Sequence, residues 1–179
     1  TAWHKEDEFW EREKAEKVFK KIKNEETALI ENAEKKQFKQ PPPVPFDLTS
    51  LQVENYRCHR ISPKETLSIS QELYTSGLIS YPRTSSQQLP EKIGFKNILK
   101  ELSKQKAYSN LTDRLLAKKI LTPNNGKKTD PAHPALFPTG ISPKSLDERE
   151  AKVYDIIVKR FMATFADPAL RETIAVEIS

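Results

Sequence analysis

The sequence predicts a mainly helical α+β fold with short β elements. Several segments free of Pro and Gly carry apolar residues at helical spacing, two helix starts carry capping signals, and the strand-like segments are short. The length of 179 residues suits one domain with an attached piece. With 36% hydrophobic and 31% charged residues, the composition excludes a disordered polyelectrolyte and a membrane protein.

The first forty residues predict a helix and a strand. Residues 6–23 are rich in Glu and Lys, and we expect a helix with one buried edge. That edge would consist of apolar residues: Phe9, Trp10, Val18, Phe19 and Ile22. Residues 27–38 are expected to form a strand. The prolines of residues 41–45 then predict an extended connector, where the chain changes domain, because each ring fixes φ and removes an N–H donor.

Capping signals mark the next two helices. Residues 49–52 offer Thr49 as a hydroxyl N-cap with Gln three positions later, and Ser62 repeats the device with Pro at the first helical position. The second helix should stop at Gly77, a residue suited to the left-handed helix exit. Residues 78–81 are β-prone. A helix, a glycine turn and a short strand resemble part of a winged helix.

Three more helices, a loop and a strand complete the prediction. Residues 90–104, 111–120 and 147–165 have apolar residues at helical spacing, and residues 172–179 are typical of a strand. Residues 121–142 contain four prolines and two glycines. A loop of this length is uncommon unless it has a function, so it is the first place to look for one.

The basic charge is concentrated in the middle of the chain. Thirty Lys and Arg against 25 Asp and Glu give a net charge of +5, but residues 57–128 alone hold 14 basic and five acidic side chains, a net charge of +9. This distribution indicates one surface that meets a polyanion such as nucleic acid or an anionic membrane.

The cysteine content and the apolar runs indicate the compartment. Cys58 is the only cysteine, so neither an internal disulfide nor a cysteine-based zinc site is expected. The apolar runs are short and no signal peptide is evident, so we expect a cytoplasmic protein without membrane contact. The chain has no initiating Met and opens in mid-pattern, which suggests a piece of a larger protein.

The candidate site begins at residues 77–86, Gly-Leu-Ile-Ser-Tyr-Pro-Arg-Thr-Ser-Ser. Tyr81, Arg83 and three hydroxyls lie within six residues there. A Tyr-Pro-Arg sequence alone is usually a structural turn. The adjoining basic segment favours phosphate handling, because Arg can grip phosphate oxygens with two parallel hydrogen bonds.

Four motifs, in their order and spacing, resemble type IA DNA topoisomerases, closest to the archaeal topoisomerases I and III. They are residues 45–52, 62–74, 77–86 and 133–140 (His-Pro-Ala-Leu-Phe-Pro-Thr-Gly). The resemblance implies a winged-helix-like domain at residues 46–145 that carries the active-site tyrosine. This domain would be inserted into part of a β-rich arch domain, whose flanks are residues 1–40 and 146–179.

The resemblance also implies site residues. Tyr81 would be the nucleophile, which attacks a phosphodiester of single-stranded DNA and forms a 5′-phosphotyrosyl link without ATP. Arg83 would neutralise the scissile phosphate, and His133 would contact phosphate. Thr84 would be a DNA-binding residue that supplies a hydroxyl to hold the backbone.

Further DNA contacts are expected around these residues. Ser85 is a candidate DNA contact, although many members of the family have Asp at this position, which puts the contact made by that Asp in doubt. Lys92 and Lys96 belong to an attractive basic face rather than to individual phosphate sites.

The resemblance implies Mg²⁺ in the full-length enzyme, held by an acidic metal-binding domain N-terminal to these residues. We expect no metal site in this chain and no relaxation activity from it alone. The expected partners are single-stranded and negatively supercoiled DNA and the metal-binding domain of the same polypeptide, and the expected location is the nucleoid.

Two alternatives stay open. The chain could belong to the topoisomerase half of a reverse gyrase, which shares these motifs. It could also be a non-catalytic winged-helix module that only binds DNA, although such a module does not explain why Tyr81, Arg83 and His133 occur in this order.

Overall fold

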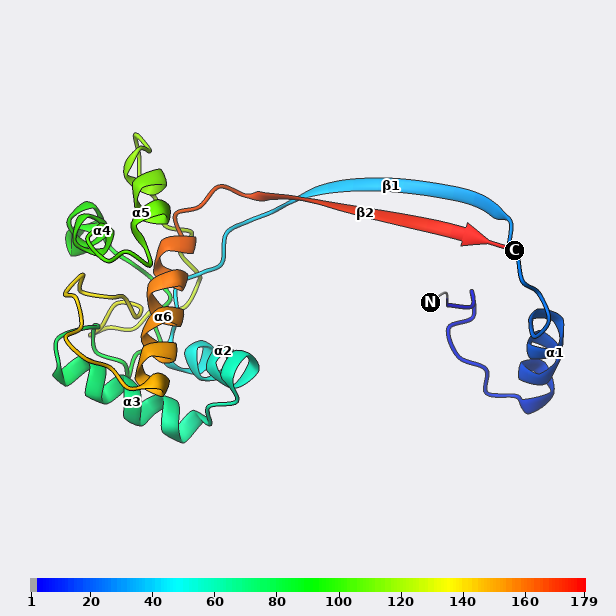
Figure 1. The fold of residues 1–179 in the computed structure, drawn as a ribbon, viewed down its shortest axis with the longest axis horizontal. Helices are drawn as coiled ribbons and strands as arrows, with labels where there is room; N and C mark the ends of the chain where they lie inside the picture. The colour runs from blue at the N-terminus through cyan, green and yellow to red at the C-terminus, as the bar shows by residue number, and fades with distance from the viewer. Residues whose placement is uncertain (1–2) are drawn as a thin grey trace. The chain divides into compact units, whose positions relative to one another are not determined.

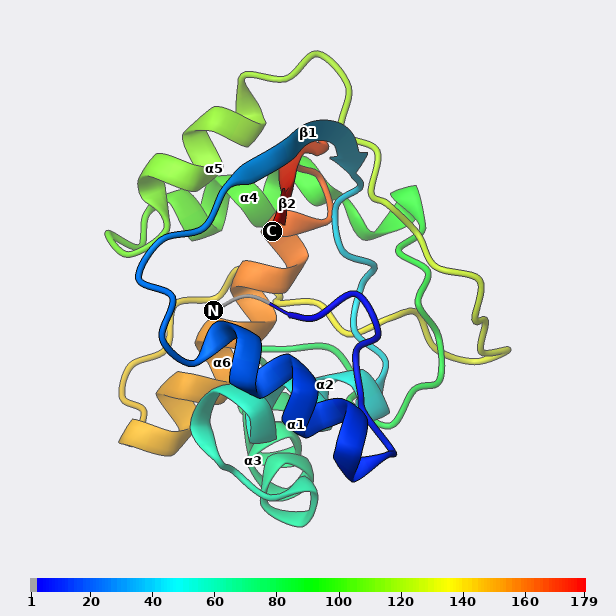
Figure 2. The same ribbon diagram turned by 90° about the vertical axis from the view of Figure 1, so that its right-hand side faces the viewer.

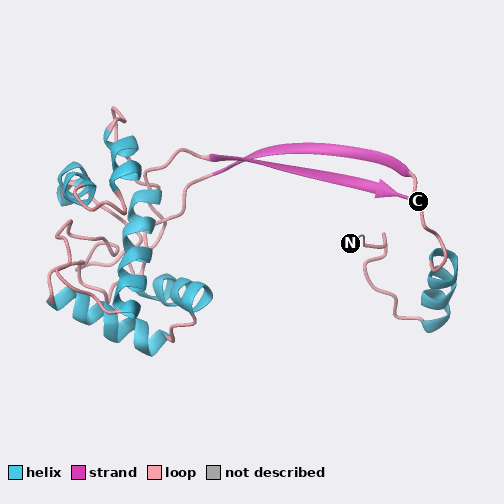
Figure 3. Cartoon of the chain, viewed as in Figure 1, coloured by secondary structure: helices cyan, strands magenta, loops and turns pink. Residues whose placement is uncertain are grey.

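The computed structural model describes residues 3–179, which divide into two compact units. One unit contains the chain up to Phe38 together with Leu170–Ser179, and the other contains Lys39–Ala169. The secondary structure is mainly helical with one two-stranded sheet, as expected for the predicted α+β class (Figure 3). The expected C-terminal flank, residues 146–179, is therefore divided between the two units.

The first unit contains helix α1 (Arg12–Ile22) and most of strands β1 (Ile30–Gln40) and β2 (Ala169–Ile178). Leu29 and Ser179 exchange both backbone hydrogen bonds at 3.0 Å, the pattern of an antiparallel pair. Both predicted strands are therefore confirmed.

The predicted N-terminal helix differs from the observed one in two ways. Helix α1 begins at Arg12 rather than at residue 6, so Trp10 precedes it. The expected buried edge is wrong, because α1 has no buried residue and Phe19 is 58% exposed. No other element of its own unit covers this face in residues 3–38 and 170–179.

The second unit is a group of five α-helices and one short 3₁₀ helix (Figures 1 and 2). They are α2 (Leu48–His59), α3 (Pro63–Thr75), η1 (Glu91–Ile93), α4 (Phe95–Ser103), α5 (Ser109–Leu116) and α6 (Glu148–Ala163). Helix α6 packs against α2, α3 and α5, and α4 packs against α5. The inner face of α6 supplies much of the core: Val153, Tyr154, Ile157, Val158, Phe161 and Met162.

Helix α2 begins with a different cap from the one expected. Asp47, not Thr49, is the N-cap, and it forms a capping box with Ser50. The Asp47 carboxylate also accepts hydrogen bonds from Gln87 Nε2 at 3.2 Å and Lys128 Nζ at 3.0 Å. The Asp47 carboxylate is almost fully buried, and burial raises its pKa, but the hydrogen bonds with Ser50 and then the contact with Lys128 outweigh burial and hold the pKa below its ordinary value.

The other turn signals agree with the structure except at two places. Ser62 caps α3, and Gly77 has the expected left-handed φ of 72°. The helix expected at residues 90–104 is interrupted at Gly94, whose φ is 79°. Residues 78–81 form only one isolated bridge, between Ile79 and Pro138, so the winged-helix detail is not confirmed by the described residues.

The proline connector is attached to the second unit along its length. Asn124 Nδ2 donates to Pro42 O, and Arg160 Nη1 donates to Val44 O at 3.2 Å. The Arg160 guanidinium also lies 4.0 Å from the centre of the Phe46 ring. The extended segment therefore has fixed partners on the helical unit.

The predicted long loop is confirmed, since no helix or strand occurs between α5 and α6 in the described chain. It is held by backbone hydrogen bonds to the segment that follows the Tyr-Pro-Arg sequence. Gln87 N donates to Lys128 O, Gly126 N donates to Gln87 O, and Ala135 N donates to Gln88 O. The loop therefore has a defined path against residues 84–89.

Gly140 should tolerate substitution poorly, because it combines a positive φ with close neighbours. Its φ is +95°, and an added Cβ would lie 2.9 Å from Glu101 Cβ and 3.3 Å from Ile98 O. We expect Gly140→Ala to lower the free energy of unfolding by about 2–4 kcal/mol in chemical denaturation. Gly94→Ala is the matched control, because its φ is also positive but its nearest contact is 3.8 Å away, and it should lose about 1–2 kcal/mol. Equal losses of unfolding free energy in the two variants would show that the close contacts at Gly140 add nothing to the cost of substitution.

Candidate active site

The Tyr-Pro-Arg segment lies against the middle of the long loop. Ser80 N donates to Phe137 O at 2.9 Å, and Phe137 N donates to Ser80 Oγ at 3.0 Å. Thr139 N donates to Leu78 O at 3.0 Å. These bonds bring together two motifs that are far apart in the sequence.

Tyr81 is half-buried between two aromatic rings. Its ring centre lies 4.6 Å from that of His133, with the planes tilted by 44°, and 5.3 Å from that of Tyr74 in an edge-on arrangement. The structure thus places Tyr81 and His133 in direct ring contact. Tyr74, the residue before the last one of α3, was not among the predicted site residues, although it ends the motif at residues 62–74.

The polar ends of three candidate residues are unused. Within residues 3–179, the Tyr81 hydroxyl, the Arg83 guanidinium and the ring nitrogens of His133 have no hydrogen-bond or ion-pair partner. Arg83 is exposed, and its guanidinium forms no cation–π pair with an aromatic ring among residues 3–179. A nucleophile, a cation and an imidazole are therefore available to a ligand such as a phosphodiester.

Thr84 connects three parts of the site. Its Oγ1 donates to His133 O at 3.4 Å and accepts from Ser86 N at 3.0 Å. Its carbonyl accepts from Leu48 N at 3.0 Å, at the start of α2. Thr84 is only 4% exposed, so its hydroxyl serves the protein backbone and is not free for a ligand.

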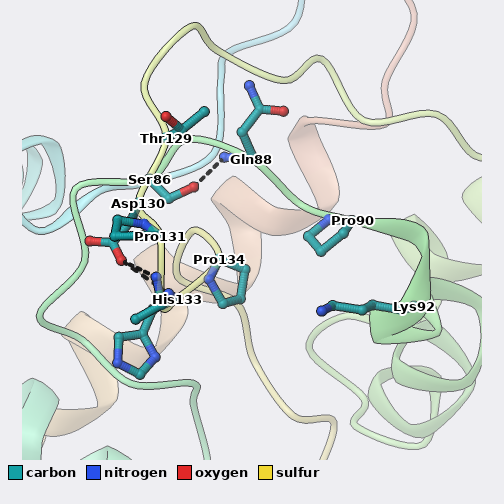
Figure 4. Close-up of a pocket in the computed structure, with 10 residues that line it drawn as sticks. Ser86, Gln88, Pro90, Lys92, Thr129, Asp130, Pro131, His133 and Pro134 are labelled. Carbon is teal, nitrogen blue, oxygen red and sulfur yellow. Dashed lines mark hydrogen bonds between the residues drawn. The ribbon is translucent and has the colours of Figure 1, made fainter.

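Asp130 is the site residue that the sequence did not reveal. Its carboxylate accepts from Ala132 N at 2.9 Å and from His133 N at 3.0 Å (Figure 4). It also accepts from Ser85 N at 3.3 Å and from Ser85 Oγ at 3.2 Å. The backbone hydrogen bonds from Ala132, His133 and Ser85, in that order, lower the pKa of Asp130 to about 2. The Asp-Pro sequence before His133 is typical of such a side-chain-to-backbone turn.

A hollow of about 240 Å³ opens beside His133 (Figure 4). Residues 86–92 and 129–134 supply its lining: Ser86, Gln88, Pro90, Lys92, Thr129, Asp130, Pro131, Ala132, His133 and Pro134. Lys96 lines a different hollow, together with Lys119. Lys92 and Lys96 therefore line different hollows, and Lys92 shares its hollow with His133.

The part of the chain that the structure describes offers neither a metal cluster nor a membrane span. No group of three or more His, Cys, Asp or Glu in residues 3–179 could hold a metal ion. Among these same residues, no helix is both long enough and apolar enough to span a bilayer.

Comparison with known proteins gives a consistent family. A family model described as DNA topoisomerase matches residues 1–179. DNA topoisomerase 1 of Pyrococcus horikoshii is 44% identical over 180 residues, which cover 99% of this chain and 26% of the relative. DNA topoisomerase 1 of Methanothermobacter thermautotrophicus is 52% identical over 137 residues, covering 76% of this chain and 19% of the relative.

A solved structure agrees with these relatives. Full-length topoisomerase I from Thermotoga maritima matches 98% of this chain and 28% of its own chain, with 25% identity and a TM-score of 0.66. The chain therefore spans about a quarter of the length of the proteins that it resembles.

Acid should disrupt the Asp130 contacts only at very low pH. The folded pKa of about 2 lies below the ordinary value of 3.8, so the contacts stabilise the fold fully above about pH 4 and are lost as the pH falls through about 2. In an NMR titration, the amide protons of Ser85, Ala132 and His133 should share a transition near pH 2, and Asp130→Asn should abolish it. A shared midpoint near 3.8 would contradict the assignment.

Proposed function

This chain belongs to the type IA DNA topoisomerases, and on that basis we propose that it is part of an enzyme that cuts and reseals one DNA strand through Tyr81. The observation that carries the proposal is the Tyr81 hydroxyl, which has no partner in residues 3–179 and whose ring packs at 4.6 Å on the ring of His133. Negatively supercoiled DNA that exposes single strands is the proposed substrate.

The proposed reaction exchanges one phosphodiester for another. Tyr81 Oη attacks the phosphorus, the Tyr81 O–P bond forms, and the bond from phosphorus to the 3′-oxygen breaks. The phenol gives up its proton, and the departing 3′-oxygen takes one up. Resealing is the same exchange in reverse, so no ATP is needed. A phenol, with a pKa of about 10, leaves phosphorus more readily than an aliphatic alcohol does.

Arg83 and His133 have complementary roles in this proposal. The exposed Arg83 guanidinium can grip two phosphate oxygens and neutralise charge that develops on them. His133 offers ring nitrogens beside the nucleophile, where a scissile phosphate must lie. Thr84 supports the pair indirectly, because its hydroxyl bonds to the carbonyl of His133.

Magnesium would have to be held by residues outside this chain. The described residues contain no candidate metal cluster, so no step is assigned to the ion here. We propose that Mg²⁺ and the group that protonates the 3′-oxygen belong to another domain of the same polypeptide. Residues 1–179 alone would then bind DNA without relaxing it. The nucleoid in the cytoplasm is the proposed location.

Replacing the nucleophile tests the reaction directly. Full-length protein incubated with a single-stranded oligonucleotide and Mg²⁺, then denatured, should yield a covalent adduct that Tyr81→Phe abolishes. The matched control is Tyr74→Phe, which removes the hydroxyl of the neighbouring ring and should keep most of the adduct.

Two outcomes would contradict this proposal. An adduct that survives Tyr81→Phe would exclude Tyr81 as the nucleophile. Absence of any adduct with the unmodified protein would instead favour a module that only binds DNA. Positive supercoiling that requires ATP would identify the reverse gyrase alternative.

The two lysines should differ in their effects on cleavage. Lys92 lines the hollow that contains His133, whereas Lys96 lines another hollow. Lys92→Glu should lower the rate of adduct formation about tenfold, because it places a negative charge beside the bound strand. Lys96→Glu makes the same change of charge and should lower the rate about twofold. Both rates come from quenched time courses at low salt, and equal effects would point to a diffuse basic face.

A further inference from the structure

We propose that Asp130 is a positioning residue for the cleavage step, because it fixes the backbone of His133 and so keeps the His133 ring against Tyr81. This inference rests on the proposed function of Tyr81. It assigns a role to a side chain that neither the sequence motifs nor the fold had suggested.

The two oxygens of the Asp130 carboxylate hold two different segments. Oδ1 accepts from the backbone N–H groups of Ala132 and His133, at 2.9 and 3.0 Å. Oδ2 accepts from the N–H and the hydroxyl of Ser85, at 3.3 and 3.2 Å. One carboxylate therefore fastens the loop of His133 to the segment that carries Tyr81.

The main chain of His133 is held on both sides while its ring stays available. Its N–H is bonded to Asp130, and its carbonyl accepts from Thr84 Oγ1 at 3.4 Å. Pro134 follows it and restricts its φ and ψ to extended values. Because the ring nitrogens have no partner in residues 3–179, the ring can meet a ligand without first breaking a bond within this part of the chain.

The charge of Asp130 does not oppose DNA binding as strongly as its position suggests. Four donors surround the carboxylate and disperse its negative charge. The same donors lower its pKa to about 2, so it stays ionised at neutral pH and does not exchange protons there. Asp130 thus acts as a fixed acceptor and not as an acid or base.

The test measures rate and affinity separately in the full-length protein. The rate is that of adduct formation on a saturating single-stranded oligonucleotide labelled at its 3′ end, with Mg²⁺. The affinity is measured by fluorescence anisotropy without Mg²⁺. We expect Asp130→Ala to lower the rate about 10- to 100-fold and to change the affinity less than twofold, because small displacements of an active-site group have effects of this size.

Two further variants separate the effect of losing the hydrogen bonds from the effects of losing the negative charge and of misfolding. Asp130→Asn keeps one carbonyl oxygen that can accept from Ala132 and His133. It should therefore lower the rate of adduct formation less than Asp130→Ala does. Asp113→Asn removes the same charge from an exposed position on α5 and should leave the rate unchanged. If circular dichroism shows that Asp130→Ala does not fold, Asp130→Asn replaces it in every comparison.

A double-mutant cycle tests whether Asp130 acts through His133. In a His133→Ala background, the Asp130 substitution should have no further effect on the rate. As a readout independent of activity, the His133 ring protons should lose the ring-current shift from Tyr81 when Asp130 is replaced.

The outcomes distinguish the two proposals. The positioning role is overturned by a normal rate in the Asp130 variants, by an equal loss with and without His133, or by unchanged ring shifts. The proposed function fails separately, if the adduct survives Tyr81→Phe or never forms.

Discussion

The contact between residues 78–89 and the loop of residues 126–139 is the one on which the rest of the site depends. Neither segment contains a helix or an extended strand, so each must find partners for its backbone groups in the other. Prolines in both segments remove N–H groups that would otherwise need acceptors. The result is a loop with a specified path, and that path places the His133 ring on Tyr81.

The sequence predicted the helices of the second unit well and the N-terminal helix poorly. Periodicity and local capping are short-range signals, so α3 and α6 follow from their residues alone. The cap of α2 depends on Lys128 and Gln87, which approach Asp47 from distant parts of the chain. Helix α1 has an amphipathic sequence, yet an apolar face is buried only when another element covers it.

The candidate site shows the same division between local and long-range information. Tyr81, Arg83 and His133 could be predicted as site residues because their motifs are short and ordered. Asp130 was missed because its partners, apart from the adjacent turn, lie in another segment, and a single Asp before Pro has many ordinary explanations. The sequence also did not indicate that Lys92 and Lys96 lie on different elements, since Gly94 ends η1 between them and α4 begins at Phe95.

The attachment of the proline connector has a mechanical consequence. A force on the connector would act on the helical unit at residues 41–46, where Asn124 and Arg160 donate hydrogen bonds to the connector backbone. Phe46 is bridged to Leu136, three residues beyond His133, so the load path passes next to the loop that carries the imidazole. Residues 41–46 are therefore joined to the loop of His133 within a few covalent and hydrogen bonds, so a shift of the connector backbone would change the position of the imidazole.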